Sequence, residues 1–168
     1  MHYRFDEPLI EGIIKSRPNR FLMEVEVGGK LLLCHCPVTG RIGDVSFSDI
    51  PCLLSLEEIA SRRTNLTVEA ISLDKASKKK KNWIAINQKT INNHINFFIK
   101  NNFLPKMKLG KVVRREVILN SSRIDFCVDE AYMEIKMSLL EIESGPIIKQ
   151  RRTINLIHFK DGIDNLRI

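Results

Sequence analysis

The chain has 168 residues, a formal net charge of +7 and a pI of about 9.4, which is enough length for one domain or two small ones. No stretch approaches the ~18 apolar residues that cross a bilayer, and the N-terminal segment MHYRFDEPLIEG has acids where a signal peptide has an apolar run. We therefore expect a cytoplasmic protein with no membrane partner. The basic balance favours an anionic partner, with nucleic acid first.

The four cysteines do not form a recognisable metal or disulfide motif. Cys34, Cys36, Cys52 and Cys127 include no CxxC pair, so reduced and partly buried thiols are expected. In the segment CHC, the two cysteines face one side of a strand and His35 faces the other. These three side chains therefore cannot share one ion, and packing is the favoured role of the cysteines.

The first part of the chain is rich in strand patterns. Residues Phe21–Val27, FLMEVEV, alternate between acidic and apolar side chains, which is typical of a half-buried strand. The two glycines that follow predict a hairpin turn, and Lys30–Cys36 returns as the next strand. Further strands are predicted over Ser46–Ser55 and Leu66–Leu73. Short strands at close spacing indicate a small barrel or sandwich.

A lysine-rich segment follows these strands. Residues Lys75–Asn82, KASKKKKN, contain four consecutive lysines, which repel one another and are not expected in a core. The segment is interpreted either as a solvated hairpin tip or linker, or as a loop that contacts phosphate groups. The sequence alone leaves both interpretations open.

The pattern changes near Asn82, where a second unit is predicted to begin. Apolar residues at helical spacing predict a helix over Ile91–Asn102, and Pro105 ends it. Three strands are then predicted, over Val112–Leu119, Ser122–Val128 and Ala131–Met137. One more helix is predicted in the tail, over Ile148–Phe159. The expected organisation is a β-barrel domain at residues 1–81 and a second domain at residues 82–168.

Two of these strands carry charged residues at positions that look apolar. If the strands 122–128 and 131–137 pair as a hairpin, Asp125 and Glu134 become near neighbours. Two close carboxylates repel, and a shared Mg²⁺ or Mn²⁺ removes that repulsion. Lys136 shares a strand face with Glu134, where it would either hold a phosphate oxygen or stabilise the attacking water. This set fits metal-assisted phosphodiester hydrolysis, although a solvated strand face with alternating charge shows the same pattern.

Several motifs occur in a fixed order along the chain. They are PLIEGIIKSRPNRFLMEVEV, LCHCPVTGRI, RRTNLTVEAI, AINQKTINNHI, RREV, SSRIDF and YMEIK. Together, from about Phe5 to Lys136, they resemble the sugar fermentation stimulation protein family, described as DNA-binding proteins of bacteria and archaea. The resemblance implies a mainly β, OB-like barrel at the N-terminus, followed by an α/β domain like those of the PD-(D/E)XK nucleases.

The same resemblance implies a set of site residues. The nuclease pattern falls on Asp125, Glu134 and Lys136 as catalytic residues. Glu116 joins Asp125 and Glu134 as an expected ligand of Mg²⁺, for which Mn²⁺ can substitute. The expected contacts with nucleic acid, DNA above all, are Arg17, Arg20, His35, Thr39, Arg41 and Arg123.

Departures from the family pattern bear on activity. Val38 stands in HCPVTG where the family usually has asparagine, and the FPDA motif that follows E-x-K in the family is absent. The chain stops short of the usual family length, so the second domain is expected to be incomplete at its C-terminus. Catalysis needs groups held to fractions of an ångström, so an incomplete domain affects catalysis more than it affects DNA binding. The expected function is therefore DNA binding with little sequence preference. The alternative is a Mg²⁺-dependent DNA or RNA endonuclease; no oligomeric state is predicted.

Overall fold

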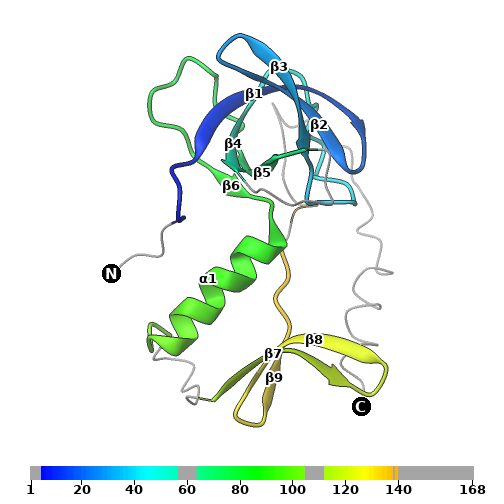
Figure 1. The fold of residues 1–168 in the computed structure, drawn as a ribbon, viewed down its shortest axis with the longest axis vertical. Coiled ribbons are helices and arrows are strands. Elements are labelled where there is room, and N and C mark those ends of the chain that lie inside the picture. The colour runs from blue at the N-terminus through cyan, green and yellow to red at the C-terminus, as the bar shows by residue number, and fades with distance from the viewer. Residues whose placement is uncertain (1–4, 57–63, 105–111, 138, 140–168) are drawn as a thin grey trace, which may run out of the picture.

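The structure is a computed structural model, and it describes residues 5–56, 64–104, 112–137 and 139. Within these ranges, two groups of strands are separated by one helix (Figure 1). The elements in chain order are β1 (Ile10–Asn19), β2 (Leu22–Val27), β3 (Lys30–His35), β4 (Ile50–Leu56), β5 (Leu66–Ile71), β6 (Ile84–Ala85), α1 (Gln88–Lys100), β7 (Val113–Leu119), β8 (Ser122–Val128) and β9 (Ala131–Met133). No helix in the described ranges is long and apolar enough to cross a membrane.

The first five strands close into a barrel. The sheet order is β3-β2-β1-β4-β5-β6, and a parallel pair of His35 in β3 with Thr67 in β5 joins the two sides. The predicted β2–β3 hairpin is confirmed, and Gly28 and Gly29 in its turn have φ values of 57° and 77°, which favour glycine. Strand β1, which the sequence pattern did not predict, lies between β2 and β4. Strand β6 pairs with β5 beyond residue 81, the predicted end of the barrel domain.

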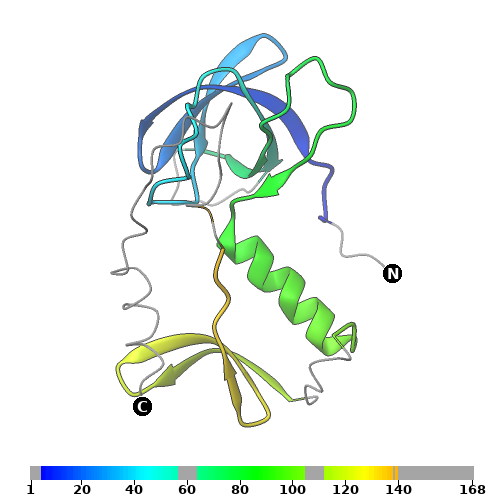
Figure 2. The ribbon, with the colours of Figure 1, turned by 180° about the vertical axis from the view of Figure 1, so that it is seen from behind.

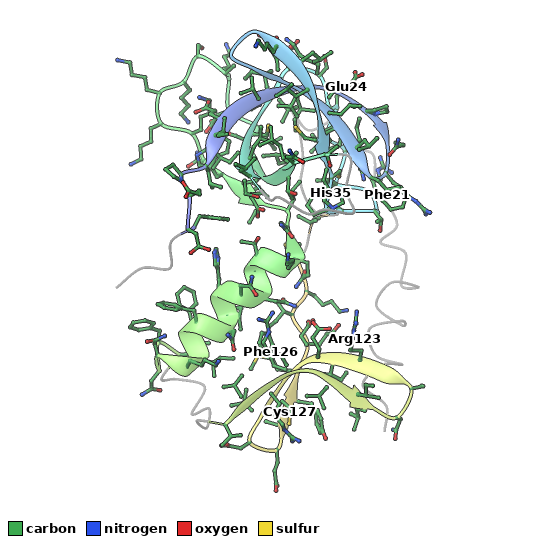
Figure 3. All side chains as sticks on the ribbon, viewed as in Figure 1. Phe21, Glu24, His35, Arg123, Phe126 and Cys127 are labelled. Carbon is green, nitrogen blue, oxygen red and sulfur yellow. The ribbon has the colours of Figure 1, made fainter. Side chains whose placement is uncertain are left out.

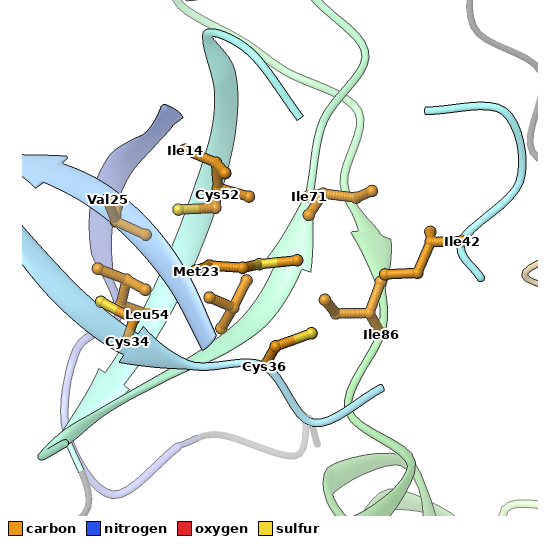
Figure 4. Close-up of a cluster of buried hydrophobic side chains, with 11 residues drawn as sticks. Ile14, Met23, Val25, Cys34, Cys36, Ile42, Cys52, Leu54, Ile71 and Ile86 are labelled. Carbon is orange, nitrogen blue, oxygen red and sulfur yellow. The ribbon is translucent and has the colours of Figure 1, made fainter. Parts of the chain in front are cut away.

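The barrel core contains three of the four cysteines (Figure 4). Cys34, Cys36 and Cys52 are fully buried beside Met23, Val25 and other apolar side chains, and every cysteine of the chain is a free, buried thiol. Burial raises the pKa of the Cys34 thiol to about 11 and that of Cys52 to about 12. These thiols therefore stay protonated at neutral pH and pack as small apolar side chains.

Helix α1 begins three residues before its predicted start. Asn87 is the N-cap residue, and its side-chain oxygen accepts a hydrogen bond from the backbone N–H of Lys89. The helix ends at Lys100, two residues before its predicted end. There the N–H of Asn102 donates to Ile99 O, and Asn102 adopts a left-handed φ of 57°.

The last three strands form a separate antiparallel sheet, β7-β8-β9. Strands β7 and β8 match their predicted ranges to within one residue. Strand β9 ends at Met133, four residues before its predicted end at Met137, and the following residues run on towards the barrel (Figure 2). The helix predicted at residues 148–159 lies outside the described residues.

Helix α1 packs on this sheet through a small second core. Ile99 contributes from the helix, and Phe126 and Val128 contribute from β8. Phe97 and Phe98 are half-buried and form an aromatic cluster with Phe103, with ring centroids 6.0–6.2 Å apart. His94 is also half-buried, and its ring meets the Phe5 ring edge-on.

A buried carboxylate joins the barrel to α1. Glu69 in β5 is 4% exposed and accepts hydrogen bonds from Ser55 Oγ (2.7 Å), Asn87 Nδ2 (3.0 Å) and Thr90 Oγ1 (2.7 Å). Asn87 caps the helix and Thr90 lies in its first turn, so Glu69 lies at the positive end of the helix dipole. The chain also returns to the barrel after β9, where Leu139 packs against the barrel core.

Candidate nucleic-acid interface and carboxylate pair

Arg17 in β1 organises one end of the barrel. Its Nη1 donates to Gly40 O (3.1 Å), and its Nη2 donates to Arg20 O (3.3 Å) and to Val38 O. The guanidinium also lies 5.6 Å from the centre of the Phe47 ring. Arg17 therefore ties the β1–β2 turn to the loop after β3. Its predicted contact with phosphate stays a prediction, and in this structure its terminal nitrogens donate to backbone carbonyls.

The β1–β2 turn presents a cation stacked on an aromatic ring. Arg20 is exposed, and its guanidinium lies 4.6 Å from the centre of the Phe21 ring. The Phe21 side chain is itself 46% exposed, while its carbonyl accepts a hydrogen bond from Cys36 N–H (2.8 Å). Figure 3 shows Phe21 and His35 at the same edge of the barrel. Arg20 is among the predicted contacts with nucleic acid and Phe21 is not, although both belong to the segment RPNRF.

Thr39 and Arg41 lie on the loop that Arg17 holds. Both residues are exposed. Arg41 Nε donates to Gly43 O (2.9 Å), and its Nη2 forms an ion pair with Asp44. The Arg41 side chain remains 61% exposed, so its charge is available at the surface. The structure therefore places Arg20, Thr39 and Arg41 on two neighbouring segments, held together by Arg17.

His35 lines a pocket between the barrel and the start of α1. The pocket has a volume of about 190 Å³. It is lined by His35, Pro37, Thr67, Asn87, Gln88 and Lys89. His35 points away from the core that holds Cys34 and Cys36, as predicted from the strand alternation.

The predicted carboxylate pair forms between β8 and the segment after β9. The register pairs Phe126 with Met133, and its continuation sets Asp125 opposite Glu134. The backbone N–H of Asp125 donates to Glu134 Oε2 (3.3 Å), and Ile135 N–H donates to Asp125 Oδ2 (2.8 Å). Both acids are half-buried. The expected proximity of Asp125 and Glu134 is therefore confirmed.

Two amide side chains of α1, which the sequence analysis did not single out, hold this pair from the helix. Asn92 is 6% exposed, and its Nδ2 donates to Asp125 Oδ1 (2.8 Å). Gln88 Nε2 donates to Asn92 Oδ1 (2.8 Å) and to Ile135 O (3.1 Å). Residues four apart lie on the same face of a helix, so Gln88 and Asn92 share a face with Ile95 and Ile99. Two amide residues in line with the apolar residues of this face were the sequence signal that could have predicted a buried polar contact.

The remaining predicted site residues divide into two groups. Lys136 Nζ donates to Glu134 Oε1 (2.7 Å), which adds a cation to the carboxylate pair. Glu116 lies opposite Asp125 in the β7–β8 register, but it has a left-handed φ of 52° and its carboxylate pairs with Arg123 Nε (2.9 Å). Within the described ranges, no three Asp, Glu, His or Cys side chains lie close enough together to hold a metal ion. The metal ligands stay predictions.

The barrel and the elements after it define the class of protein. A five-stranded barrel in the order β3-β2-β1-β4-β5, closed by the β3–β5 pair, is an OB-like fold, here followed by a helix and a three-stranded sheet. The family model described as the SfsA N-terminal OB domain matches residues 16–86. A solved structure, Pyrococcus furiosus SfsA in complex with Ca²⁺, has a TM-score of 0.60 and 19% identity, and the match covers 75% of this chain and 51% of that chain.

Sequence relatives agree with this class. The sugar fermentation stimulation protein homolog of Synechococcus sp. (strain JA-2-3B'a(2-13)) is 32% identical over 139 residues, which cover 80% of this chain and 56% of the relative. The homolog of Natranaerobius thermophilus is 26% identical, and that match covers 94% of this chain and 60% of the relative. The chain belongs to the sugar fermentation stimulation protein family. It spans little more than half the length of these curated relatives.

Proposed function

We propose that this chain binds DNA at one end of its OB-like barrel, with little preference for sequence. The observation that carries the proposal is the set of hydrogen bonds made by Arg17, which holds the turn bearing Arg20 and Phe21 beside the loop bearing Arg41. Exposed guanidinium groups would meet phosphates, and the Phe21 ring would stack on a base. The net charge of +7 supports an anionic ligand.

This proposal is tested by titrating fluorescent single-stranded and duplex oligonucleotides at several salt concentrations. Contacts with phosphates release counterions, so affinity is expected to fall steeply as salt rises. The Phe21→Ala variant is expected to weaken single-strand binding at least about fivefold, because stacking on an aromatic side chain contributes about 1–3 kcal/mol per base. Phe103→Ala is the matched control, because Phe103 is 44% exposed and lies at the far end of α1.

Two results would contradict the proposal. The first is an affinity that does not change with salt, since it would exclude phosphate contacts as the main source of binding. The second is equal binding by the Phe21→Ala and Phe103→Ala variants, since it would exclude the barrel end as the interface.

A second candidate function is metal-dependent cleavage of the bound nucleic acid. The specific observation in its favour is the cluster of Asp125, Glu134 and Lys136, which the strand register and three hydrogen bonds bring together. A divalent ion at the two acids would supply an activated water and neutralise developing charge on the phosphate. Lys136, whose side chain is 67% exposed, would meet a phosphate oxygen.

The donor set fits a hard divalent cation. Mg²⁺ commonly binds proteins through one or two carboxylates and retains several waters, so Asp125 and Glu134 are a sufficient pair. Each of their four oxygens accepts one hydrogen bond here, which leaves a second lone pair on each oxygen. The related Pyrococcus furiosus SfsA was solved in complex with Ca²⁺, which also prefers oxygen ligands.

Calorimetric titration with Ca²⁺ and cleavage of supercoiled plasmid and RNA with Mg²⁺ test this second function. Asp125→Ala is expected to weaken Ca²⁺ binding at least about tenfold, a loss of about 1.4 kcal/mol, and to abolish cleavage. Lys136→Ala is expected to retain the ion and lose cleavage. Glu130→Ala, which removes an exposed acid from the β8–β9 turn, is the matched control. Cleavage at full rate by Asp125→Ala would exclude this site as the catalytic centre. Salt-sensitive binding by the wild-type chain without any cleavage would support DNA binding and exclude the nuclease function.

A further inference from the structure

The lysine-rich segment is an ordered loop of the barrel. It connects β5 to β6, and residues 74–82, DKASKKKKN, are called the lysine loop below. They contain five lysines and one aspartate. In Figures 1 and 2 the loop projects from the side of the barrel, away from the edge where Figure 3 places Phe21 and His35. It is therefore separate from the proposed interface at Arg20 and Phe21.

Asp74 closes the lysine loop from inside. Its Oδ1 accepts a hydrogen bond from Lys78 Nζ (2.8 Å), and its Oδ2 accepts one from the backbone N–H of Asn82 (2.7 Å). A further hydrogen bond from Lys78 N–H to Lys75 O (3.0 Å) forms a tight turn between them. The bond from Lys78, and then that from Asn82, hold the pKa of Asp74 below its ordinary value of 3.8. The carboxylate is therefore ionised at neutral pH.

Lys81 fixes the other end of the run of four lysines. Its side chain is only 5% exposed, and its ammonium group pairs with Glu11 Oε1 (2.6 Å) on β1. The same group donates to Lys78 O (2.8 Å). The expectation that these lysines stay out of the protein interior is therefore wrong for Lys81, because Glu11 and a carbonyl replace its water. Lys78 and Lys81 hold the loop in place.

The other lysines of the loop point to solvent. Lys75, Lys79 and Lys80 are exposed, and within the described part of the chain their ammonium groups make no ion pair or hydrogen bond. Three like charges on a closed loop repel one another, and an anion with several charges relieves that repulsion. Because the loop is already ordered, binding through it costs less conformational entropy than binding through a flexible lysine tail.

We propose that the lysine loop is a preformed binding element for the phosphates of a nucleic acid strand, with Lys79 and Lys80 as its main contacts. The inference rests on the proposed DNA binding and adds a second contact region to it. A nucleic acid fits better than a membrane surface, because the loop has no aromatic or large apolar side chain to enter a bilayer. Asp74 and Lys81 act as positioning residues, since they shape the loop without facing the ligand.

The test measures binding of a duplex of about 30 base pairs over a salt series, a length well above the ~4–16 nucleotides that one OB fold covers. The double variant Lys79→Ala/Lys80→Ala is expected to lower the slope of log affinity against log salt by about 1.8, at about 0.9 for each lost phosphate contact. The matched control is Lys30→Ala/Lys100→Ala, which removes two exposed lysines elsewhere. Its slope is expected to change by less than half as much.

The Asp74→Asn variant separates a preformed loop from a simple excess of positive charge. This substitution raises the net charge by one, so a pure charge effect would tighten binding. We expect affinity to fall about threefold instead, because asparagine has one acceptor oxygen in place of two, so the loop loses one of the two hydrogen bonds that Lys78 Nζ and the Asn82 N–H donate. Tighter binding by Asp74→Asn would overturn the preformed loop.

The remaining outcomes are also decisive. Equal salt slopes for the two double variants would overturn the proposal, while weakened binding by Phe21→Ala in the same assay would show that DNA binding itself stands. If the wild-type chain binds no duplex, the proposed function fails first. Vesicles of phosphatidylserine and phosphatidylcholine form a third arm. Lysine-dependent binding to them at equal or greater strength would replace nucleic acid by a membrane surface.

Discussion

Arg17 and Asn92 are polar residues whose side chains hold other candidate site residues in place. Arg17 donates to carbonyls on two segments, and Asn92 donates to a carboxylate oxygen of Asp125. Neither side chain presents its charge or dipole chiefly to solvent, so the role of each is to position the residues that it contacts. Asn92 is the better test of this role, because it is buried and has one acceptor and one donor partner.

At the residue scale, we predict that Asn92→Leu lowers the free energy of unfolding by about 1–3 kcal/mol. The substitution keeps the size of the side chain but leaves Asp125 Oδ1 without its donor and Gln88 Nε2 without one of its acceptors. Urea unfolding measures the change. Asn93→Leu, on the next position of α1, is the control, and an equal loss in both variants would contradict the role given to Asn92.

At the element scale, β1 is a strand that its own sequence pattern does not predict. It carries Gly12 and Pro18, residues that are unfavourable within strands. The β1–β2 register shifts between Ile14 and Ser16 and again between Ser16 and Asn19, so Pro18 lies at an irregular part of the ladder. The strand forms because it pairs on both sides, with β2 and with β4.

Gly12 allows a direct test of the close packing between β1 and β2. A Cβ atom there would lie 2.6 Å from Val25 Cγ1 and 3.1 Å from both Glu26 O and Val27 Cγ2. We therefore predict that Gly12→Ala lowers the free energy of unfolding by about 1–3 kcal/mol through overpacking. Gly40→Ala is the control, because a Cβ atom there meets nothing within 4 Å. Thermal melting of both variants measures the difference, and a stable Gly12→Ala would refute the close approach of β1 and β2.

At the scale of the whole molecule, the barrel and the helical part are joined by Glu69 and by the segment that ends at Leu139. Glu69 receives donors from β4, from the helix cap and from the first turn of α1. A carboxyl group can be buried this deeply because three donors satisfy its oxygens. The two parts are therefore expected to unfold together.

We predict that Glu69→Ala lowers the free energy of unfolding by about 3 kcal/mol, since each buried donor left unpaired costs about 1–3 kcal/mol. Trp83, the only tryptophan of the chain, directly precedes β6 and reports on the barrel sheet through its fluorescence, and far-ultraviolet circular dichroism reports on α1. The two signals should melt together in the wild-type chain and separate in the variant. Coincident melting at an unchanged temperature in Glu69→Ala would show that Glu69 does not join the two parts.

The sequence by itself determined the features that depend on local periodicity. The alternation in Phe21–Val27 and the two glycines after it predict the β2–β3 hairpin, because strand period and turn geometry are local properties. The proximity of Asp125 and Glu134 follows from counting residues on either side of a short turn. The family resemblance gave the OB-like barrel, which the family model and the relative of known fold support.

Tertiary structure alone decided which polar groups became partners across elements. Gln88 and Asn92 reach the carboxylate pair only because α1 packs against β8, and no local pattern encodes that contact. Arg17 was expected to face phosphates, yet its terminal nitrogens donate to carbonyls that lie up to 23 residues away. The lysine run was ambiguous for the same reason. Its outer residues are fixed by Asp74 and by Glu11, and a bond between residues 70 positions apart is set by folding, not by sequence pattern.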